Sequence, residues 1–304
     1  MTESTAGSAS GSPADGGPVL LAELAVLPGH LLWRAAARVT ATAATELPDE
    51  VDVHAYAVLV ALKGGAVRSQ QDLADGIAVS RTTMTKVARD LVRAGLVARV
   101  RNPEDRRSYA LSRTPAGTRA EATWRAHVLR VQRAVAPGLS VPERADLADL
   151  LRRVVEPRLS ADIPAELWSA LGFLVVKAHA VAHRDVLAAL EPWGLEPRHL
   201  GSSTVLRALG PVPQVALARA LGVTPASTVQ IVDELERLAL VERRRSTTDR
   251  RTQLLHLTPG SAAVLPEAGR AAGRAMDDVL GVLDASERSR LVALLQRFVT
   301  SATS

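Results

Sequence analysis

The segments EDRRSYALSRTPAG (residues 104–117) and TDRRTQLLHLTPGS (residues 248–261) share one pattern of an aspartate, two arginines, a mostly apolar run and a Thr-Pro pair. Asp105 and Asp249 lie 144 positions apart. At this offset, 15 of the 43 residue pairs that begin with Leu73 and end with Pro115 are identical, and the match needs no gap. Solenoid repeats have periods of roughly 20 to 50 residues, so this longer period indicates two duplicated domains.

The composition predicts a mainly α protein. Of the 304 residues, 47% are hydrophobic and only 3% aromatic, and residues with high helix propensity dominate over strand formers. The absence of cysteine excludes disulfides and thiolate metal ligands. No apolar run approaches the length of about 18 residues that a membrane span needs. Residues 1–18 have neither the basic start nor the apolar core of a signal peptide. We therefore expect a flexible tail over 1–26 and a cytoplasmic protein.

Each repeat unit predicts a helix-turn-helix followed by a β-hairpin. In the first unit, Ser69 and Asp72 are spaced as a capping box, Ser80 can cap the next helix, and Gly95 can end it. In the second unit, Thr224 and Pro225 have the order of an N-cap and a first helical residue. The expected helices of the first unit cover 54–62, 69–77 and 80–94, with strands at 96–101 and 109–111; those of the second cover 214–221 and 224–238, with strands at 240–245 and 253–257.

Long helices are expected on both sides of these motifs. Helices are predicted over 31–46 and 165–190 before the two units, and over 115–135 and 140–154 after the first hairpin. Proline, serine and aspartate interrupt the periodicity between 157 and 164. We therefore predict a first unit over 27–158 and a second over 163–300.

The positive charge is concentrated in the first unit. Residues 80–115 hold nine Lys or Arg and three acids, a net charge of +6, whereas residues 224–259 hold six Arg and five acids, a net charge of +1. An arginine run is most often a solvated surface. Two arginine-rich hairpins in register, each behind a helix-turn-helix, favour contact with a nucleic acid instead.

The sequence resembles the MarR (multiple antibiotic resistance regulator) family of winged-helix transcription factors. The features that carry this resemblance are the capped helix-turn-helix, the hairpin with D-R-R and a following Thr-Pro, and the long flanking helices. The resemblance covers about residues 27–299. It implies two tandem winged helix-turn-helix domains. Family members are usually homodimers, so two units on one chain resemble a covalently fused dimer, an intramolecular pseudodimer. Such a chain can supply both readers of a twofold operator, whose half-sites lie about 34 Å apart.

By this resemblance, the helices that begin at Ser80 and Thr224 lie in the major groove, and the hairpins form wings that reach the minor groove. In each wing the aspartate is expected to orient the arginine two positions on. The resemblance implies the following DNA-binding residues in the first unit: Ser80, Arg81, Thr82, Thr83, Thr85, Lys86, Arg89, Arg99, Arg101, Arg106 and Arg107, with Asp105 as the orienting residue. In the second unit they are Thr224, Ser227, Thr228, Gln230, Arg243, Arg245, Arg250 and Arg251, with Asp249 as the orienting residue and Pro225, Ala226 and Val229 on the same helix.

The two units differ in charge, and two explanations remain open. Asp233, Glu234, Glu236 and Glu242 lie in the second helix and wing. They either face solvent, or they weaken the DNA contact of that half, which implies an asymmetric operator or a half that has drifted toward sensing. Arg113 occupies the position of Leu257, where the family pattern has an apolar residue, and we expect it to be tolerated at a strand end.

Family members commonly bind small molecules between the helical region and the winged domain. By this resemblance we expect a pocket near Trp33, His54, Trp168, His179, His183 and Trp193, although tryptophan on a packing helix is more often part of the core. His179 and His183 share a helix face but have no further ligands in an arranged pattern, so no metal and no cofactor is expected.

The alternatives to DNA binding are an enzyme and a protein-interaction module. Phosphate loops, Rossmann glycines and nucleophile elbows are absent from the sequence, which argues against an enzyme. A tandem winged-helix protein-interaction module, with incidental basic wings, is the alternative. The prediction is a sequence-specific regulator, a repressor released by a small-molecule effector, which binds double-stranded DNA as a monomeric pseudodimer without contact to a membrane.

Overall fold

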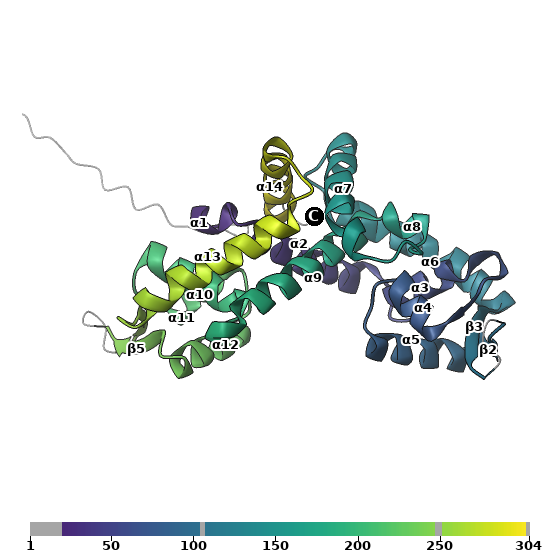
Figure 1. Ribbon diagram of the computed structural model, residues 1–304, viewed down its shortest axis with the longest axis horizontal. Helices are drawn as coiled ribbons and strands as arrows, with labels where there is room; N and C mark the ends of the chain where they lie inside the picture. Colours follow the sequence, from purple (N-terminus) through teal and green to yellow (C-terminus); the bar gives the residue numbers. More distant parts are fainter. Residues whose placement is uncertain (1–19, 104–106, 247–250, 302–304) are drawn as a thin grey trace, which may run out of the picture.

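The computed structural model describes residues 20–103, 107–246 and 251–301, in two similar halves joined by a short connection (Figure 1). The first half contains α1 (Ala22–Ala25), α2 (Pro28–Glu46), α3 (Val53–Ala61), η1 (Lys63–Gly65), β1 (Val67–Ser69), α4 (Gln70–Gly76), α5 (Arg81–Arg93), β2 (Val97–Arg101), β3 (Tyr109–Arg113), α6 (Pro115–Ala134), α7 (Val141–Val155) and η2 (Glu156–Arg158). The second contains α8 (Ala165–Trp168), α9 (Leu171–Leu190), η3 (Glu191–Trp193), α10 (Pro197–Leu209), β4 (Val212–Pro213), α11 (Gln214–Leu221), α12 (Pro225–Arg237), β5 (Val241–Arg245), β6 (Gln253–Leu257), α13 (Ser261–Val279) and α14 (Ala285–Thr300).

The predicted helix caps are present in the first helix-turn-helix. The Ser69 hydroxyl accepts from the Asp72 N–H, and the Asp72 carboxylate accepts from the Ser69 N–H, so α4 begins with a complete capping box. The Ser80 hydroxyl accepts from the Thr83 N–H at the start of α5. Gly95, with φ 68°, reverses the chain after α5. These caps fix where each helix starts and ends, and hence which residues α5 turns outward.

The second helix-turn-helix repeats this arrangement with other residues. The Thr224 hydroxyl accepts from the Ser227 N–H, and Pro225 is the first residue of α12. Each half carries a three-stranded antiparallel sheet, with the order β1-β3-β2 in the first and β4-β6-β5 in the second. The hairpins β2-β3 and β5-β6 were predicted, whereas the edge strands β1 and β4 and the helix α10 were not.

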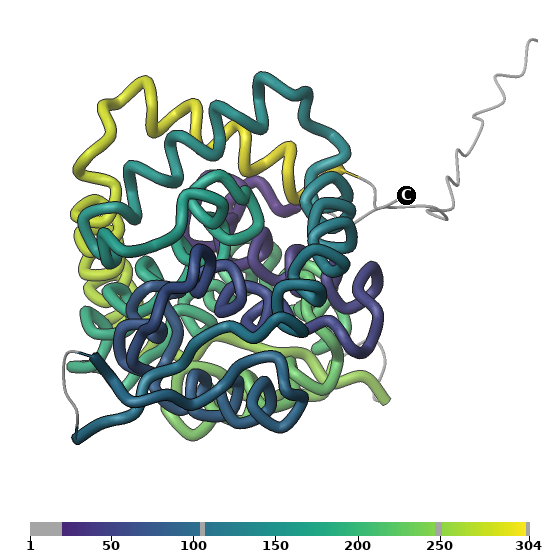
Figure 2. Tube along the Cα trace, turned by 90° about the vertical axis from the view of Figure 1, so that its right-hand side faces the viewer, coloured from purple at the N-terminus to yellow at the C-terminus, as the bar shows by residue number. Residues whose placement is uncertain are grey.

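The flanking helices join both halves around one core. α9 packs against α2, α7 and α13, and α14 packs against α2. One hydrophobic cluster therefore combines Leu31, Leu147, Leu174 and Leu291, which come from four helices of the two halves. A second cluster, with Leu59, Leu73 and Met84, lies inside the first winged domain. Figure 2 shows α7 and α14 together at the end of the molecule opposite α5 and α12.

Ion pairs between α7 and α14 occur in a reciprocal arrangement. The Arg153 Nη2 lies 3.0 Å from the Glu287 carboxylate, and Arg297 pairs with Glu143. Arg153 and Arg297 are related by the 144-residue offset, and so are Glu143 and Glu287. A contact from residue i to residue j that is repeated from j to i is typical of a twofold interface. The 144-residue offset thus relates the two ion pairs to each other.

Two segments differ from the sequence-based expectation. The helix expected over 165–190 is broken into α8 and α9, because Ala170 has extended backbone angles (φ −89°, ψ 104°). This break lets Ile163 and Leu167 pack into the core of the first winged domain. Residues 20–26, which the expected tail includes, contain α1, and the Leu24 side chain there is fully buried.

Within the described residues, no single helix has both the length and the apolar composition of a membrane span. The helices α11 and α12 meet that criterion only as a pair, and the pair is bent by 110°.

Candidate nucleic-acid interface

α5 turns a polar face away from the core of the first winged domain. Its apolar residues Met84, Val87 and Leu91 are buried. The other face exposes the predicted readers Ser80, Arg81, Thr82, Thr85, Lys86 and Arg89, while Thr83 is half-buried. Thr83 is held at the helix start by a 2.9 Å contact between its hydroxyl and that of Ser80, and the Thr85 hydroxyl donates to the Arg81 carbonyl. The exposed face has the width and polarity of a helix that reads base edges.

The first wing extends from the same side of this domain. Arg99 and Arg101 are exposed on β2, and Arg107 is exposed before β3. The Arg101 guanidinium lies 5.4 Å from the ring centroid of Tyr109, which is its partner across the hairpin. The predicted residues Asp105 and Arg106 lie outside the described part of the wing. A guanidinium held over an aromatic ring keeps its charge near the surface and restricts its side-chain motion.

α12 presents a less basic face than α5. Thr224, Ser227 and Gln230 are exposed, and so are Pro225, Ala226 and Val229. Thr228 is fully buried and its hydroxyl donates to the Thr224 carbonyl at 3.0 Å. The prediction that Thr228 contacts DNA is therefore wrong. Thr228 stands in register with the buried Met84, so its position on the helix assigns it to the core.

Arg243 in the second wing is neutralised by acidic neighbours. One Nη of Arg243 lies 2.7 Å from the Asp233 carboxylate, and the other pairs with Glu236. At the positions of these two acids, the first half has Arg89 and Val92. A guanidinium already paired with two carboxylates offers little net charge to a phosphate. The acids of α12 thus do not simply face solvent, because two of them bind the arginine predicted to contact DNA.

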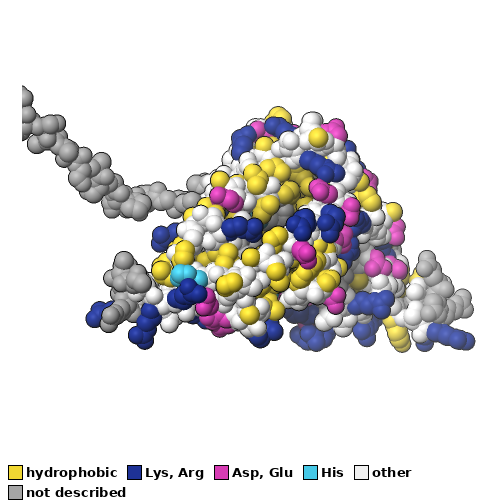
Figure 3. Space-filling view, turned by 60° about the vertical axis from the view of Figure 1, so that its left-hand side comes forward, with side chains coloured by type: hydrophobic (Ala, Val, Ile, Leu, Met, Phe, Trp, Pro, Cys, Tyr) yellow, Lys and Arg dark blue, Asp and Glu magenta, His cyan; other side chains and the backbone are white. Residues whose placement is uncertain are grey.

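The remaining wing arginines of the second half stay at the surface. Arg245 and Arg251 are exposed, and Arg244 pairs with Glu242. Asp249 and Arg250 lie outside the described residues of this wing. In Figure 3, lysine and arginine side chains gather along the lower edge of the molecule, the edge at which α5 and α12 lie in Figure 1.

Arg113 has a structural partner that the sequence did not suggest. Its side chain is only 12% exposed, lies 3.5 Å from the Glu121 carboxylate and donates to the Leu59 carbonyl at 3.2 Å. Glu121 itself is buried and also lies 2.8 Å from Arg125. Leu257 and Leu265 occupy the same two positions in the second half. Arg113 is therefore not merely tolerated at a strand end: a buried ion pair replaces a leucine pair.

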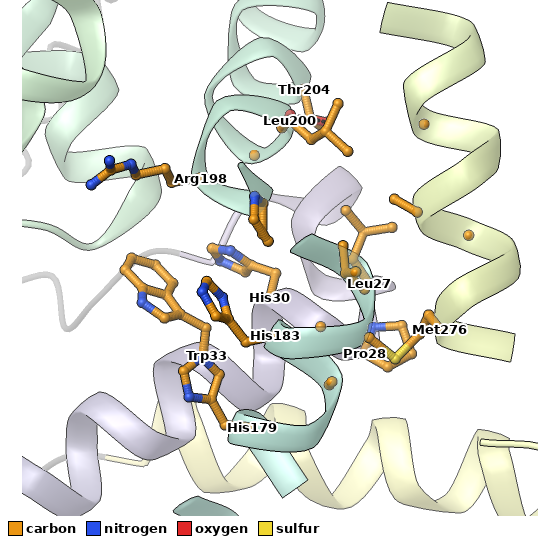
Figure 4. Close-up of a pocket in the computed structure, with 18 of the residues that line it drawn as sticks. Leu27, Pro28, His30, Trp33, His179, His183, Arg198, Leu200, Thr204 and Met276 are labelled. Atoms are coloured by element: carbon orange, nitrogen blue, oxygen red, sulfur yellow. Dashed lines mark hydrogen bonds between the residues drawn. The ribbon is translucent and has the colours of Figure 1, made fainter. Parts of the chain in front are cut away.

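A cavity of about 470 Å³ lies between the second winged domain and flanking helices of both halves. It brings together three of the six predicted pocket residues, Trp33, His179 and His183, and adds His30 (Figure 4). The other three lie elsewhere. His54 contacts Asp52 at 3.7 Å, and Trp168 and Trp193 pack against the hydrophobic core. The lining comes from α2, α9, α10, α12 and α13, so the cavity lies between the shared helices and the winged domain.

The imidazoles of His30 and His179, which line this cavity, are neutral near pH 7. Burial, followed by the charge of Arg34, lowers the pKa of His30 to about 4. Burial, followed by the charge of His183, lowers the pKa of His179 to about 4 as well. The Nε2 of His30 is buried without a hydrogen-bond partner among the described residues. Within the same residues, no three His, Asp or Glu side chains are grouped as a metal site requires.

Comparison with known proteins agrees with this architecture. The model of the MarR family matches residues 50–108 and 193–252, one region in each half. A Thauera aromatica protein named for transcriptional regulation of the hcr operon is 30% identical over 157 residues, which are 51% of this chain and 87% of that protein. Among solved structures, the transcriptional repressor CouR bound to a 23-mer DNA duplex is 30% identical (TM-score 0.41), covering 43% of this chain and 92% of that one. A mutant MarR from E. coli complexed with operator DNA is 25% identical (TM-score 0.39), covering 41% and 90%.

Two exposed, capped helices beside basic wings define a winged-helix DNA-binding transcriptional regulator. The chain belongs to the MarR family, and it carries the family's DNA-binding domain twice.

Proposed function

We propose that this chain is a repressor that binds a twofold-related operator as a single-chain pseudodimer. The reciprocal ion pairs Arg153–Glu287 and Arg297–Glu143 carry this proposal, because they relate the two halves as equivalent subunits. Under that relation α5 and α12 occupy equivalent places at one edge of the molecule. A protein with such a pair of helices matches two half-sites of opposite orientation on one face of the duplex.

We further propose that the first half supplies most of the affinity. Arg99 is exposed, and the first half has Arg89 and Val92 where Asp233 and Glu236 hold its counterpart Arg243. Neutralisation of phosphates by free cations releases counterions and dominates the binding energy of such proteins. The operator is therefore expected to contain one strongly bound and one weakly bound half-site.

Release by a small molecule is proposed to start from the cavity. Ile231 of α12 and Val223 of the turn before it line the cavity, as do His30 and Trp33 of α2. A ligand there touches both the second reading helix and the helices shared between the halves. A ligand that fits only one spacing of α5 and α12 shifts the population toward that spacing.

The first test is the mass of the complex in solution. Genomic DNA fragments are selected by binding to the full chain, and the free chain and the complex are measured by light scattering. We expect one chain per duplex, and we expect Arg107→Ala and Arg251→Ala to weaken the gel shift of that fragment. Two chains per duplex would contradict the pseudodimer, and failure to enrich any fragment would favour a protein-interaction module.

A further inference from the structure

The two halves differ at the place where a ligand is proposed to act. Resting on the proposed release by a small molecule, we propose that each chain binds one effector only, a largely apolar and uncharged ring compound, in the cavity beside the second winged domain. The corresponding place beside the first winged domain carries larger side chains, which leave no room for a second effector. This makes the pseudodimer a regulator with a single effector site instead of two.

Four glycines line the cavity beside the second winged domain, Gly29, Gly201, Gly269 and Gly273. A Cβ atom added at Gly269 or Gly273 meets nothing within 4 Å, and one at Gly201 makes only ordinary contact with Leu221, at 3.7 Å. At these three positions packing does not require the absence of a side chain, whereas a Cβ at Gly29 would lie 3.0 Å from the Met276 Cε. Glycine inside a helix is less stable than alanine, and the gain at the three positions is open space.

Each of these glycines corresponds to a larger residue at the equivalent place beside the first winged domain. At the 144-residue offset, Gly29 corresponds to Phe173 and Gly201 to Ala57, while Gly269 corresponds to Arg125 and Gly273 to Leu129. All four differences enlarge the side chain beside the first winged domain. A single difference of this kind is ordinary drift, but four around one cavity change its volume in one direction.

The residues at the equivalent place beside the first winged domain make contacts of their own. Lys177, at the position of Trp33, has its Nζ 5.2 Å from the Phe173 ring centroid and donates to the Ala78 carbonyl. Arg125 lies 2.8 Å from the buried Glu121, which occupies the position of the cavity residue Leu265. Burial lowers the pKa of Lys177 to about 8. Phe173 and Lys177, which are half-buried, are the side chains that take up space there, whereas Arg125 and Leu129 are exposed.

The cavity lining indicates the chemistry of the ligand. Its walls are mainly apolar, with Leu200, Ile231 and Leu280 among them, and His30 and His179 lie at one end with neutral rings. Two of its cations are already paired, because Arg198 lies 3.0 Å from Glu234 and Arg288 lies 3.3 Å from Asp277. In an uncharged ring compound, a hydroxyl or carbonyl group directed at the imidazoles forms a hydrogen bond with the unpartnered Nε2 of His30. The remaining surface of the ring is buried against the apolar walls.

This asymmetry assigns different behaviour to the two reading helices. Beside the first winged domain, the bond from Lys177 to Ala78 ties α9 to the turn between α4 and α5, and needs no ligand. Beside the second winged domain, a ligand bridges α2 and α9 to α12. Effector binding therefore changes the position of α12 directly, while the contacts of α5 stay as they are.

The test uses N-phenyl-1-naphthylamine, an uncharged aromatic probe that fluoresces in apolar surroundings. It is titrated into the full chain, and its stoichiometry is read from energy transfer from tryptophan. We expect one probe per chain. Gly273→Leu, which copies Leu129, should lower the affinity at least about tenfold, a loss of about 1.4 kcal/mol. The control is Ala263→Leu, an exposed position on α13 outside the cavity lining, which should bind as the wild type does.

The outcomes are distinguishable. Two probes per chain, no binding, or unchanged binding in Gly273→Leu would overturn the single site. Circular dichroism checks the fold of each variant, and Gly29→Phe, which copies Phe173, repeats the test if Gly273→Leu does not fold. DNA binding is measured on the same preparations with the selected fragment. Loss of DNA binding by the wild type would remove the regulator proposal, whereas the probe stoichiometry would still decide the number of sites.

Discussion

At the scale of single residues, the turn after α5 and the turn after α12 each contain a residue in the left-handed backbone conformation. Gly95 has φ 68° after α5, and Ala239 has φ 55° at the corresponding position after α12. Glycine adopts this conformation without steric cost, whereas alanine does so at a cost of about 1–2 kcal/mol. The second half thus carries a local strain that the first half avoids.

Single substitutions at these two positions should therefore have opposite effects on the free energy of unfolding. We expect Ala239→Gly to raise the free energy of unfolding by about 1 kcal/mol and Gly95→Ala to lower it by a similar amount. A Cβ at Gly95 meets nothing within 4 Å, so its effect is conformational. Urea unfolding measures both, with Ala262→Gly inside α13 as a control that should destabilise. A stabilising Ala262→Gly would show that the gain has another origin.

The buried pair Arg113–Glu121 gives a second prediction at this scale. Glu121→Leu leaves a nearly buried guanidinium without its carboxylate, and should cost about 3 kcal/mol. The double variant Arg113→Leu with Glu121→Leu, which copies Leu257 and Leu265, should fall within about 1 kcal/mol of the wild type. A double-mutant cycle by denaturant unfolding measures the coupling. Additive effects of the two changes would contradict a direct pair.

At the scale of elements, the capping residues largely determined which helices could be predicted. Ser69, Ser80, Thr224 and the Thr-Pro pairs place α4, α5, α12 and α6 within one or two residues of the sequence-based bounds. The edge strand β1 has three residues and β4 only two, one of them Pro213, so neither contains a readable alternation. The break between α8 and α9 follows from packing of Leu167 under the first winged domain, a tertiary contact that no local pattern signals.

The reading elements should respond differently to loss of equivalent arginines. We expect Arg99→Ala to weaken binding to the selected DNA fragment and to reduce the slope of log affinity against log salt by about 1. Arg243→Ala should change that slope much less, because Asp233 and Glu236 already hold its charge. Fluorescence anisotropy at several salt concentrations compares the two. Equal slopes for both variants would show that Arg243 leaves its acidic partners when DNA binds.

The start of α7 predicts a pH dependence. The Ser140 backbone N–H, then its hydroxyl and the Arg297 guanidinium, lower the pKa of Glu143 from 4.5 to about 2. This carboxylate therefore stabilises the folded state above about pH 4.5, and the stabilisation disappears as the pH falls toward 2. Glu143→Gln should flatten the acid limb of the stability curve in that window. Glu191→Gln, at an exposed carboxylate, is the control; the same acid slope in Glu143→Gln and the wild type would refute the assignment.

At the scale of the whole molecule, the cavity lining shows which residues of the site could be predicted from the sequence. Trp33, His179 and His183 were expected near a pocket from the family resemblance, and the cavity contains all three. His30 and the glycines were missed, because no single glycine or histidine carries a signal by itself. The 144-residue offset aligns Gly29 with Phe173. This difference in size indicates a cavity only when the structure shows that the two residues lie at equivalent places.

The shared core also predicts how the protein unfolds. Leu31, Leu174 and Leu291 belong to one cluster that spans both halves, so neither half keeps its core without the other. We expect a single calorimetric transition in which the van't Hoff and calorimetric enthalpies agree. The first winged domain, with its separate cluster, is the part most able to open locally. Two resolved transitions for the whole chain would contradict this coupling.

Because α7 and α9 are joined in one chain, the two halves are encoded by separate codons. In a homodimer encoded by one short gene, every substitution appears on both sides of the twofold axis, so a change that suits one half-site is imposed on the other. Here each codon specifies one side only. Gly29 can therefore differ from Phe173, and Asp233 from Arg89, without a matching change at the other position. In a chain that reads a twofold operator as proposed, selection then acts on the two half-sites as separate traits.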